Sequence, residues 1–237
     1  MKKVLTALTA VIAAAGCITA LALSAVQLAA FDEKRYERAY DRYGRYEFIG
    51  ISKPDLMRVT ADMLDYLKGS REDLLMYADI RGQRQQVFEE RELLHMEDVR
   101  GLFAGGFLIR SIGAAAAVLG IAALIFLSRK KWLKNFSIAY LALLGITVLL
   151  AGLLLAAVMT NFSDLFIKFH LMFFDNDLWL LDIDTDVLIQ MFPEEFFNSM
   201  ALAAGVYSIV ALVVPGIAAA VCLIRQKRRK RGSADAV

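Results

Sequence analysis

The stretch Phe169–Phe197, FHLMFFDNDLWLLDIDTDVLIQMFPEEFF, interleaves aromatic and aliphatic side chains with acids. It contains His170, one of only two histidines in the chain. It also contains seven carboxylates, Asp175, Asp177, Asp182, Asp184, Asp186, Glu194 and Glu195. Aromatic rings beside charged groups are typical of a segment at the boundary between lipid and water. We therefore expect the rest of the chain to hold this stretch at one face of a bilayer.

Four long stretches of the 237-residue chain carry no charged residue, namely Val4–Phe31, Ser111–Ser128, Asn135–Phe162 and Asn198–Ile224. A helix needs about 20 apolar residues to cross a bilayer. These stretches predict four transmembrane helices, near residues 5–30, 103–127, 136–160 and 199–224. The first starts like a lipoprotein signal ending at Cys17, but its apolar run continues to Ala30. We therefore expect it to remain as an uncleaved span.

The net charge of +2 hides a strong asymmetry along the chain. Twelve basic residues and one acid, Asp235, flank the spans on one side, whereas residues 161–200 carry eight acids and one base. Basic residues gather on the cytoplasmic side of a membrane. The pattern predicts cytoplasmic termini, a cytoplasmic loop 128–135 and a cytoplasmic tail 225–237, with extracytoplasmic segments 31–102 and 161–198. We interpret the basic tail as a topology anchor on anionic lipid, and expect no nucleic-acid partner.

These observations predict an all-α integral membrane protein with a single membrane domain over residues 1–237. Its four transmembrane helices would carry two extracytoplasmic helical segments that pack over the outer leaflet. Ser52-Lys-Pro-Asp55 predicts a helix start, and Gly69 predicts the end of that helix.

Two residue patterns predict packing. Tyr36, Tyr40, Tyr43 and Tyr46 recur at helical spacing, which indicates an aromatic stripe at the membrane interface. Gly145 and Gly152, with alanines nearby, indicate close helix packing within the third span.

His95 and His170 are the side chains best suited to proton transfer, because the ordinary pKa of histidine lies near 6.5. Each lies close to a predicted span on the predicted outer side. Asp98 follows His95 by one helical turn, so its carboxylate can hold the imidazole ring. This pattern favours general acid–base chemistry on a substrate that brings its own nucleophile and leaving group.

Other functions fit the residues less well. A serine hydrolase is disfavoured because the chain has no G-x-S-x-G. A zinc site of a metal-dependent lipid hydrolase would need His95, His170 and carboxylates, yet no H-x-x-x-H or H-E-x-x-H spacing occurs. We expect no metal and no cofactor. A non-catalytic membrane receptor or assembly protein stays open as an alternative.

Arg110 is the only formal charge inside a predicted span. Charges within a membrane are costly, so they are either paired or functional. Arg110 would pair with an acid, snorkel outward, or hold a phosphate or carbonyl group, and the sequence leaves these alternatives open.

Three motifs carry a resemblance to a known family. They are FH-x-x-FF-x-N-x-x-W-x-LD-x-x-TD-x-LI-x-MFPE-x-FF at Phe169–Phe197, HM-x-DV at His95–Val99, and MLDYLKG at Met63–Gly69. The chain resembles an integral membrane family of low-GC Gram-positive bacteria that includes the lipoprotein intramolecular transacylase. The similarity covers essentially the whole chain, from the order of the spans to both histidine motifs.

The resemblance implies an acyltransferase that acts on diacylglyceryl lipoproteins after signal-peptide cleavage. Such an enzyme moves the sn-2 acyl chain of the lipid onto the α-amine of the N-terminal cysteine and leaves a lyso-form lipoprotein. The partners implied are the lipoprotein substrate and membrane phospholipid, and we expect the enzyme to act as a monomer at the cell membrane, with its active site outside the cytoplasm.

The family's two motif histidines correspond to His95 and His170. The resemblance thus implies that these residues act as base and acid, in an order that the sequence does not assign. Asp98 would orient His95. The weaker candidates for positioning the substrate or an oxyanion are Arg110, Asn176 and Trp179.

Overall fold

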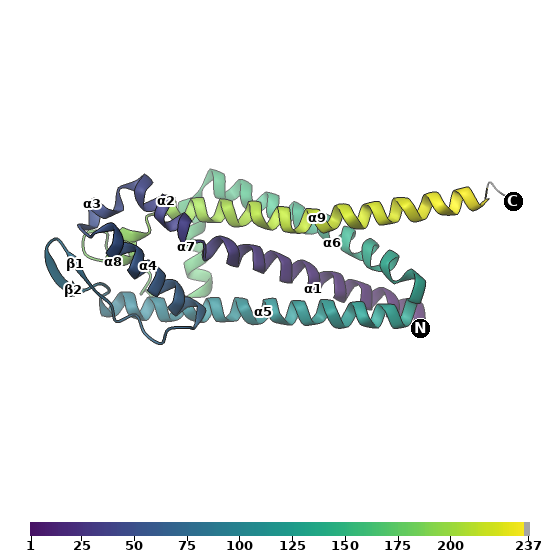
Figure 1. The fold of residues 1–237 in the computed structure, drawn as a ribbon, viewed down its shortest axis with the longest axis horizontal. Coiled ribbons are helices and arrows are strands. Elements are labelled where there is room, and N and C mark those ends of the chain that lie inside the picture. The colour runs from purple at the N-terminus through teal and green to yellow at the C-terminus, as the bar shows by residue number, and fades with distance from the viewer. Residues whose placement is uncertain (235–237) are drawn as a thin grey trace. The chain divides into compact units, whose positions relative to one another are not determined.

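The computed structural model describes residues 1–234, so residues 235–237 of the predicted tail lie outside the described residues. Helices dominate the chain (Figure 1). The elements are α1 (Lys2–Ala30), α2 (Glu33–Tyr43), α3 (Arg45–Ile49), α4 (Lys53–Lys68), β1 (Tyr77–Ile80), β2 (Gln83–Gln86), α5 (Glu90–Ser128), the 3-10 turn η1 (Arg129–Lys131), α6 (Trp132–Thr160), α7 (Phe162–Phe173), α8 (Val187–Met191) and α9 (Glu194–Ala234).

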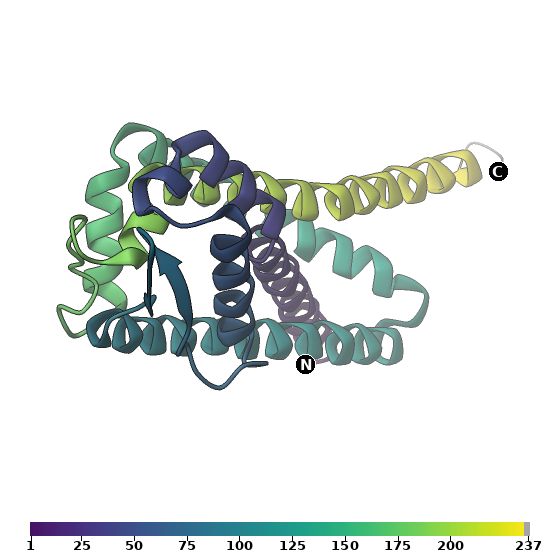
Figure 2. The same ribbon diagram turned by 60° about the vertical axis from the view of Figure 1, so that its left-hand side comes forward.

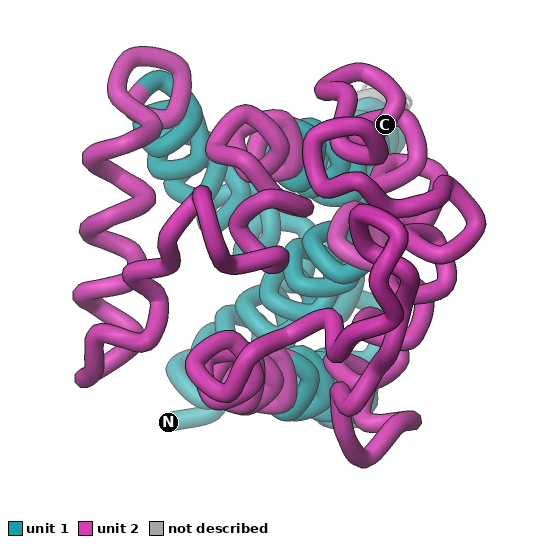
Figure 3. Tube along the Cα trace, turned by 90° about the vertical axis from the view of Figure 1, so that its left-hand side faces the viewer, with its two compact units in different colours: residues 1–27, 107–156, 203–237 teal, residues 28–106, 157–202 magenta. Residues whose placement is uncertain are grey.

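The chain divides into two compact units, coloured separately in Figure 3. We call the first the apolar unit; it comprises residues 1–27, 107–156 and the chain from 203 onward. We call the second the histidine unit; it comprises residues 28–106 and 157–202 and contains both histidines. Within residues 1–234, three helical stretches are long and apolar enough to cross a membrane, namely Lys2–Ala30, Glu90–Thr160 and Glu194–Arg229. The second of these includes both α5 and α6.

In the apolar unit, α1 and α5 meet through residues without large side chains. A Cβ added to Gly16 would lie 2.5 Å from the carbonyl oxygen of Gly113, and one added to Gly120 would lie 2.7 Å from the Cβ of Ala13. Small residues allow helix backbones to touch inside membranes. The expectation of close packing at the glycines of the third span is wrong, because a Cβ at either of them would meet nothing within 4 Å.

The core of the histidine unit combines aliphatic and aromatic side chains, and it includes part of the tyrosine stripe. Tyr36 and Tyr40 of α2 are 6% and 0% exposed, so these two rings pack in the protein core and do not form the outward-facing interfacial stripe that was predicted. The Tyr36 hydroxyl donates to the carbonyl oxygen of Ala30 at 2.7 Å, and the Tyr40 hydroxyl lies 2.8 Å from Oγ1 of Thr60. These two bonds satisfy the polar ends of rings whose bodies are buried.

Helix α4 has the ends that the sequence predicts. The Ser52 side chain accepts a hydrogen bond from the backbone N–H of Asp55, and Gly69 ends the helix with φ +83°. Glycine suits this end because a left-handed backbone costs it no Cβ clash.

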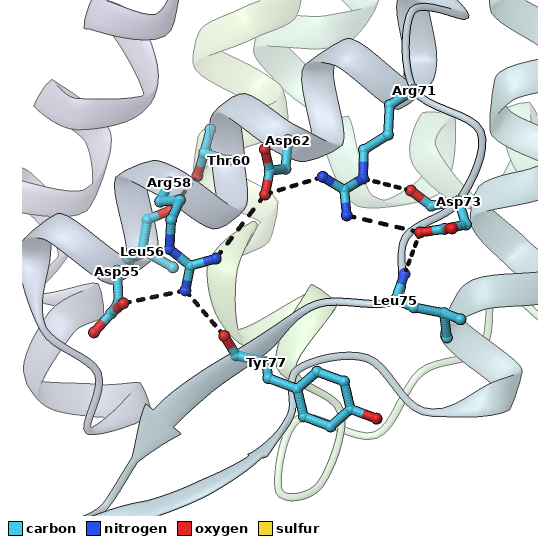
Figure 4. Close-up of polar contacts among 9 residues, drawn as sticks. All are labelled: Asp55, Leu56, Arg58, Thr60, Asp62, Arg71, Asp73, Leu75 and Tyr77. Carbon is cyan, nitrogen blue, oxygen red and sulfur yellow. Dashed lines mark hydrogen bonds and ion pairs between the residues drawn. The ribbon is translucent and has the colours of Figure 1, made fainter.

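A two-stranded antiparallel sheet, which the all-α prediction misses, follows α4. Strand β1 pairs with β2 through a turn at Arg81 and Gly82, and both turn residues have positive φ. Figure 2 shows the hairpin beside α4. Arg58 of α4 holds the hairpin by donating to the Tyr77 carbonyl at 2.9 Å, and it also pairs with Asp55 at 3.1 Å (Figure 4).

Candidate active site

Helix α7 carries His170 in its last turn. The helix starts at Asn161, whose side chain accepts from the backbone N–H of Asp164, and it ends where the Phe174 N–H bonds to the His170 carbonyl. Several large apolar side chains of α7 are exposed, among them Leu171 and Met172 at 65% and 75%. An amphipathic helix of this kind suits a lipid surface, whereas His170 is turned inward and is only 6% exposed.

The His170 ring has a fixed tautomer. Its Nδ1 lies 2.7 Å from the backbone carbonyl oxygen of Phe166. A carbonyl oxygen only accepts hydrogen bonds, so Nδ1 carries the proton and Nε2 keeps a free lone pair. Burial lowers the pKa of His170, and the bond to Phe166 opposes that change. The ring is therefore a neutral base near pH 7.

Trp179 covers one face of His170. The two rings stack with their centroids 4.7 Å apart and their planes at 27°. The indole Nε1–H donates to the backbone carbonyl of Asn176 at 3.0 Å. Because this donor is already used, Trp179 acts on His170 by stacking and by excluding water.

His95 lies on α5, before the predicted span that starts at residue 103, and is 7% exposed. Its Nδ1 is buried and has no hydrogen-bond partner among residues 1–234. Burial and, to a smaller degree, the nearby His170 lower the pKa of His95 to about 4, against the opposing effect of Asp98. At neutral pH His95 is therefore an uncharged imidazole.

The two histidines, 75 positions apart in the sequence, come together in the structure. Their ring centroids are 6.1 Å apart. Phe174 packs against both rings, with centroid distances of 5.4 Å to His95 and 5.6 Å to His170. The pair is thus enclosed by aromatic side chains, where a proton transfer would take place with little competing water.

Asp98 does not hold His95 in the way the sequence led us to expect. Its carboxylate accepts a hydrogen bond from the side-chain Nδ2 of Asn176 at 2.8 Å. The Asn176 Oδ1 in turn accepts from the backbone N–H of Leu178 at 3.1 Å. Both ends of the Asn176 amide are therefore occupied, and the residue ties the Trp179 loop to α5. Asp98 acts on His95 through its charge.

Two residues next to His95 on α5 were not among the sequence candidates. Glu92 is 0% exposed, and its two carboxylate oxygens accept from the backbone N–H groups of Glu89 and Leu188. Arg91 donates to the Asp177 carbonyl oxygen and pairs with the Asp177 carboxylate at 3.6 Å. Glu92 shares a helix face with His95 at a spacing of three residues, which is the signal that could have found it.

Arg110 belongs to the apolar unit. Its guanidinium lies 5.6 Å from the centroid of the Phe107 ring. The ion pairs of the described residues include none that involves Arg110.

A separate cavity of about 620 Å³ borders α5, and its lining includes Leu94, Glu97 and Gly101. At 100° per residue these positions lie on the helix face opposite His95, so the histidine pair is not part of this cavity. Within residues 1–234, no cluster of three or more His, Cys, Asp and Glu side chains is arranged to hold a metal ion.

Comparisons with known proteins converge on one family. The family model described as lipoprotein intramolecular transacylase Lit matches residues 11–197. The solved structure of the membrane-integral lipoprotein intramolecular transacylase Lit from Bacillus cereus is similar over 95% of this chain and 98% of that chain, with a TM-score of 0.77 at 20% identity.

Two structures of Bacillus cereus Lit variants, with a histidine replaced by arginine or by alanine, also match. Their TM-scores are 0.71 and 0.72 at 19% identity, over 95% of this chain and 95% and 96% of theirs. No curated protein sequence matches the chain. At these identities the structures show a shared fold, and the family model shows the family.

The largely helical membrane fold and the family agree with the sequence prediction. The apolar helices, together with the membrane-integral relative, make this a multi-pass membrane protein. The family match covers both histidine motifs, from His95–Val99 to Phe169–Phe197. The chain belongs to the lipoprotein intramolecular transacylase family, whose members are acyltransferases.

Proposed function

We propose that this protein moves the sn-2 acyl chain of a diacylglyceryl lipoprotein to the α-amine of its N-terminal cysteine. The observation that carries the proposal is the pair of buried, neutral imidazoles with centroids 6.1 Å apart, one of which has a fixed basic nitrogen. The substrate supplies both the amine nucleophile and the ester, so the reaction needs no serine or cysteine of the enzyme.

His170 is the base in this proposal. An α-amine has an ordinary pKa of about 8, so about a tenth of it is uncharged at pH 7. The amine nitrogen attacks the ester carbonyl carbon and loses a proton to Nε2 of His170. When the bond between that carbon and the sn-2 glycerol oxygen breaks, the same proton passes to the oxygen. An amide and an alcohol are formed, and the total mass is unchanged.

His95 is the second group that touches the substrate in this proposal. A pKa near 4 keeps it unprotonated, so it is unsuited to act as a cationic acid. A neutral imidazole donates one N–H, and this donor would stabilise the negative charge that develops on the carbonyl oxygen. The Asp98–Asn176 bond and the Trp179 stack position the pair, and Arg110 remains a candidate for holding a polar group of the substrate.

The predicted topology places this chemistry at the outer leaflet. Four spans, within α1, α5, α6 and α9, would put both termini in the cytoplasm and residues 31–102 and 161–198 outside. The support is the charge asymmetry, with twelve basic residues on one predicted side and eight acids within residues 161–200 on the other. The lipoprotein ester would then meet the histidines where it lies in the membrane.

Mass spectrometry of a lipoprotein's N-terminal peptide tests the proposal, in a bacterial host that cannot otherwise N-acylate lipoproteins. The wild type should yield a peptide of unchanged mass in which one acyl chain resists mild base, because an amide survives conditions that cleave an ester. His170→Ala and His95→Ala should each lower the rate by about 10²- to 10⁴-fold, the range for a lost acid–base group.

Lys168→Gln and Glu97→Gln are matched controls on the same two helices, since both residues are exposed. They should keep the wild-type rate. Unchanged N-acylation in both histidine variants would refute the mechanism, and an unmodified diacylglyceryl peptide from well-expressed wild type would refute the function.

A further inference from the structure

Glu92 joins two elements of the active site by its carboxylate. It is fully buried in the histidine unit. Its Oε2 accepts from the Glu89 N–H at 2.7 Å, and its Oε1 accepts from the Leu188 N–H at 2.6 Å. These are short distances, as expected for bonds to an ionised acceptor. One side chain thus satisfies two backbone donors that lie 99 positions apart in the sequence, of which the Leu188 N–H is buried.

Both donors belong to helix starts. Glu89 immediately precedes α5, and Glu92 is the third residue of that helix, so this bond is half of a capping box. Leu188 is the second residue of α8, where a backbone N–H has no partner within the helix. The Asp186 side chain precedes α8 but makes no capping bond to it; Glu92 supplies the missing acceptor from another part of the chain.

The two ends that Glu92 joins lead directly to the two histidines. His95 lies one turn after Glu92 on α5. On the other side, α8 ends the segment that begins at the Asn176 turn and contains Trp179, which stacks on His170. A change at Glu92 would therefore alter the placement of His95 relative to the ring that covers His170.

We infer that Glu92 is a positioning residue of the transacylase, whose carboxylate ties the start of α5 to the start of α8 and so sets the geometry of the histidine pair. The inference rests on the proposed function. Glu92 need not touch the substrate, because its effect passes through His95 and Trp179. A displacement of about 1 Å at reacting groups can cost about 10²-fold in rate.

The ionisation of Glu92 gives this role a signature. Burial, together with the nearby acids Asp186 and Glu89, raises the pKa of Glu92 to about 7, although the bonds from the two backbone N–H groups act to lower it. The ionised carboxylate accepts both N–H groups. The protonated acid would instead direct its own O–H proton toward one of the two N–H donors. As pH falls through 7 Glu92 takes up a proton, so the tie weakens and activity should fall. The histidines titrate at lower pH because their pKa values are lowered.

The test compares wild type, Glu92→Gln and the control Glu90→Gln by kcat, KM and the pH profile of kcat. Glu90 occupies the same turn of α5 but is exposed. We expect Glu92→Gln to lower kcat by about 10- to 100-fold with little change in KM, and to lose the part of the profile centred near pH 7. Glu90→Gln should match wild type. A Glu92→Gln enzyme with wild-type kcat and profile overturns the inference.

Two further measurements distinguish a failure of this inference from a failure of the proposed function. Hydrogen exchange of residues 187–191 should speed up in Glu92→Gln, because the Leu188 N–H loses its acceptor. If Glu92→Gln does not fold, Glu92→Asp keeps the charge but is too short to reach both donors. It should keep the pH dependence and lose kcat, and wild-type kcat there overturns the inference. Inactive wild type would instead overturn the proposed function, whatever the exchange result.

Discussion

The apolar unit and the histidine unit are stabilised by opposite kinds of contact. In the apolar unit, the backbones of α1 and α5 touch at Gly16 and Gly113. In the histidine unit, large rings such as Tyr40 fill the core, and polar side chains such as Glu92 join distant segments. Lipid gives helices no hydrophobic reason to associate, so close packing brings them together. Where water surrounds a chain, the burial of apolar surface, aromatic rings included, brings its segments together.

The difference makes opposite substitutions harmful in the two units. One added methyl group should damage the apolar unit at its close contacts, whereas the loss of one polar atom should damage the histidine unit. The chain has two tryptophans, Trp132 in the apolar unit and Trp179 in the histidine unit. Replacing either by Phe leaves a fluorescence reporter for the other unit alone.

The largest effect is expected for Gly16→Ala. The new Cβ would lie 2.5 Å from the Gly113 carbonyl oxygen and 2.8 Å from the backbone nitrogen of Ala117, so α1 and α5 must move apart. Overpacking of this kind costs about 1–3 kcal/mol. Unfolding of the apolar unit by SDS in detergent micelles, followed by Trp132 fluorescence, measures the loss.

Gly145→Ala in α6 is the matched control, because a Cβ there meets nothing within 4 Å. It should be neutral or stabilise by up to about 1 kcal/mol through helix propensity. Equal effects of the two substitutions would show that the small residues of α1 are not what allows α1 and α5 to pack closely.

The next effect is expected where Asn176 meets Asp98. N176D places two carboxylates at the 2.8 Å contact that now joins an amide to a carboxylate. Their repulsion should release the Trp179 loop from α5 and lower the transacylation rate by about tenfold, equivalent to about 1.4 kcal/mol. The rate of lyso-lipoprotein formation by purified enzyme measures the change.

The exchanged pair sharpens this test. D98N combined with N176D restores one amide and one carboxylate, and the new carboxylate can still accept from the Leu178 N–H. The double variant should recover most of the lost rate, whereas Glu97→Gln should have no effect. If the double variant is no better than N176D, the contact does not position the loop.

Sequence reasoning picked out the two candidate histidines of the histidine unit but did not predict its packing. Histidine is rare here and its ordinary pKa is suited to proton transfer, so His95 and His170 could be picked out without knowing that they meet. The pairing of Asp98 with Asn176 could not be predicted, because that bond joins segments 78 positions apart and no local pattern encodes it.

Packing in the apolar unit was harder to predict for a physical reason. The apolar stretches appear clearly in the sequence, since a bilayer demands long uncharged helices. Yet glycine gives no sign of which helix face it occupies. Gly145 looked like a packing site and Gly16 did not, while the structure places the close contact at Gly16. The tyrosine stripe failed similarly, because helical spacing identifies a shared face but not what covers it.

The smallest effect is expected for Tyr40→Phe in the histidine unit. The Thr60 hydroxyl donates to the Leu56 carbonyl at 2.8 Å, so the Tyr40 hydroxyl is the donor in its 2.8 Å bond to Thr60. Removing it keeps the ring and loses one buried hydrogen bond, which costs about 1 kcal/mol. Trp179 fluorescence during SDS unfolding, in a Trp132→Phe background, reports the change.

Tyr43→Phe is the control for this prediction, because its hydroxyl makes a long, exposed 3.4 Å bond to the Glu195 carbonyl. Exposed groups exchange one partner for water, so this variant should unfold like wild type. A loss at Tyr43 as large as that at Tyr40 would mean that burial does not decide how much a hydroxyl bond stabilises the histidine unit. A loss confined to Tyr40 would extend to the core of the histidine unit the rule already drawn from Glu92 and Asn176, that single polar atoms stabilise this unit.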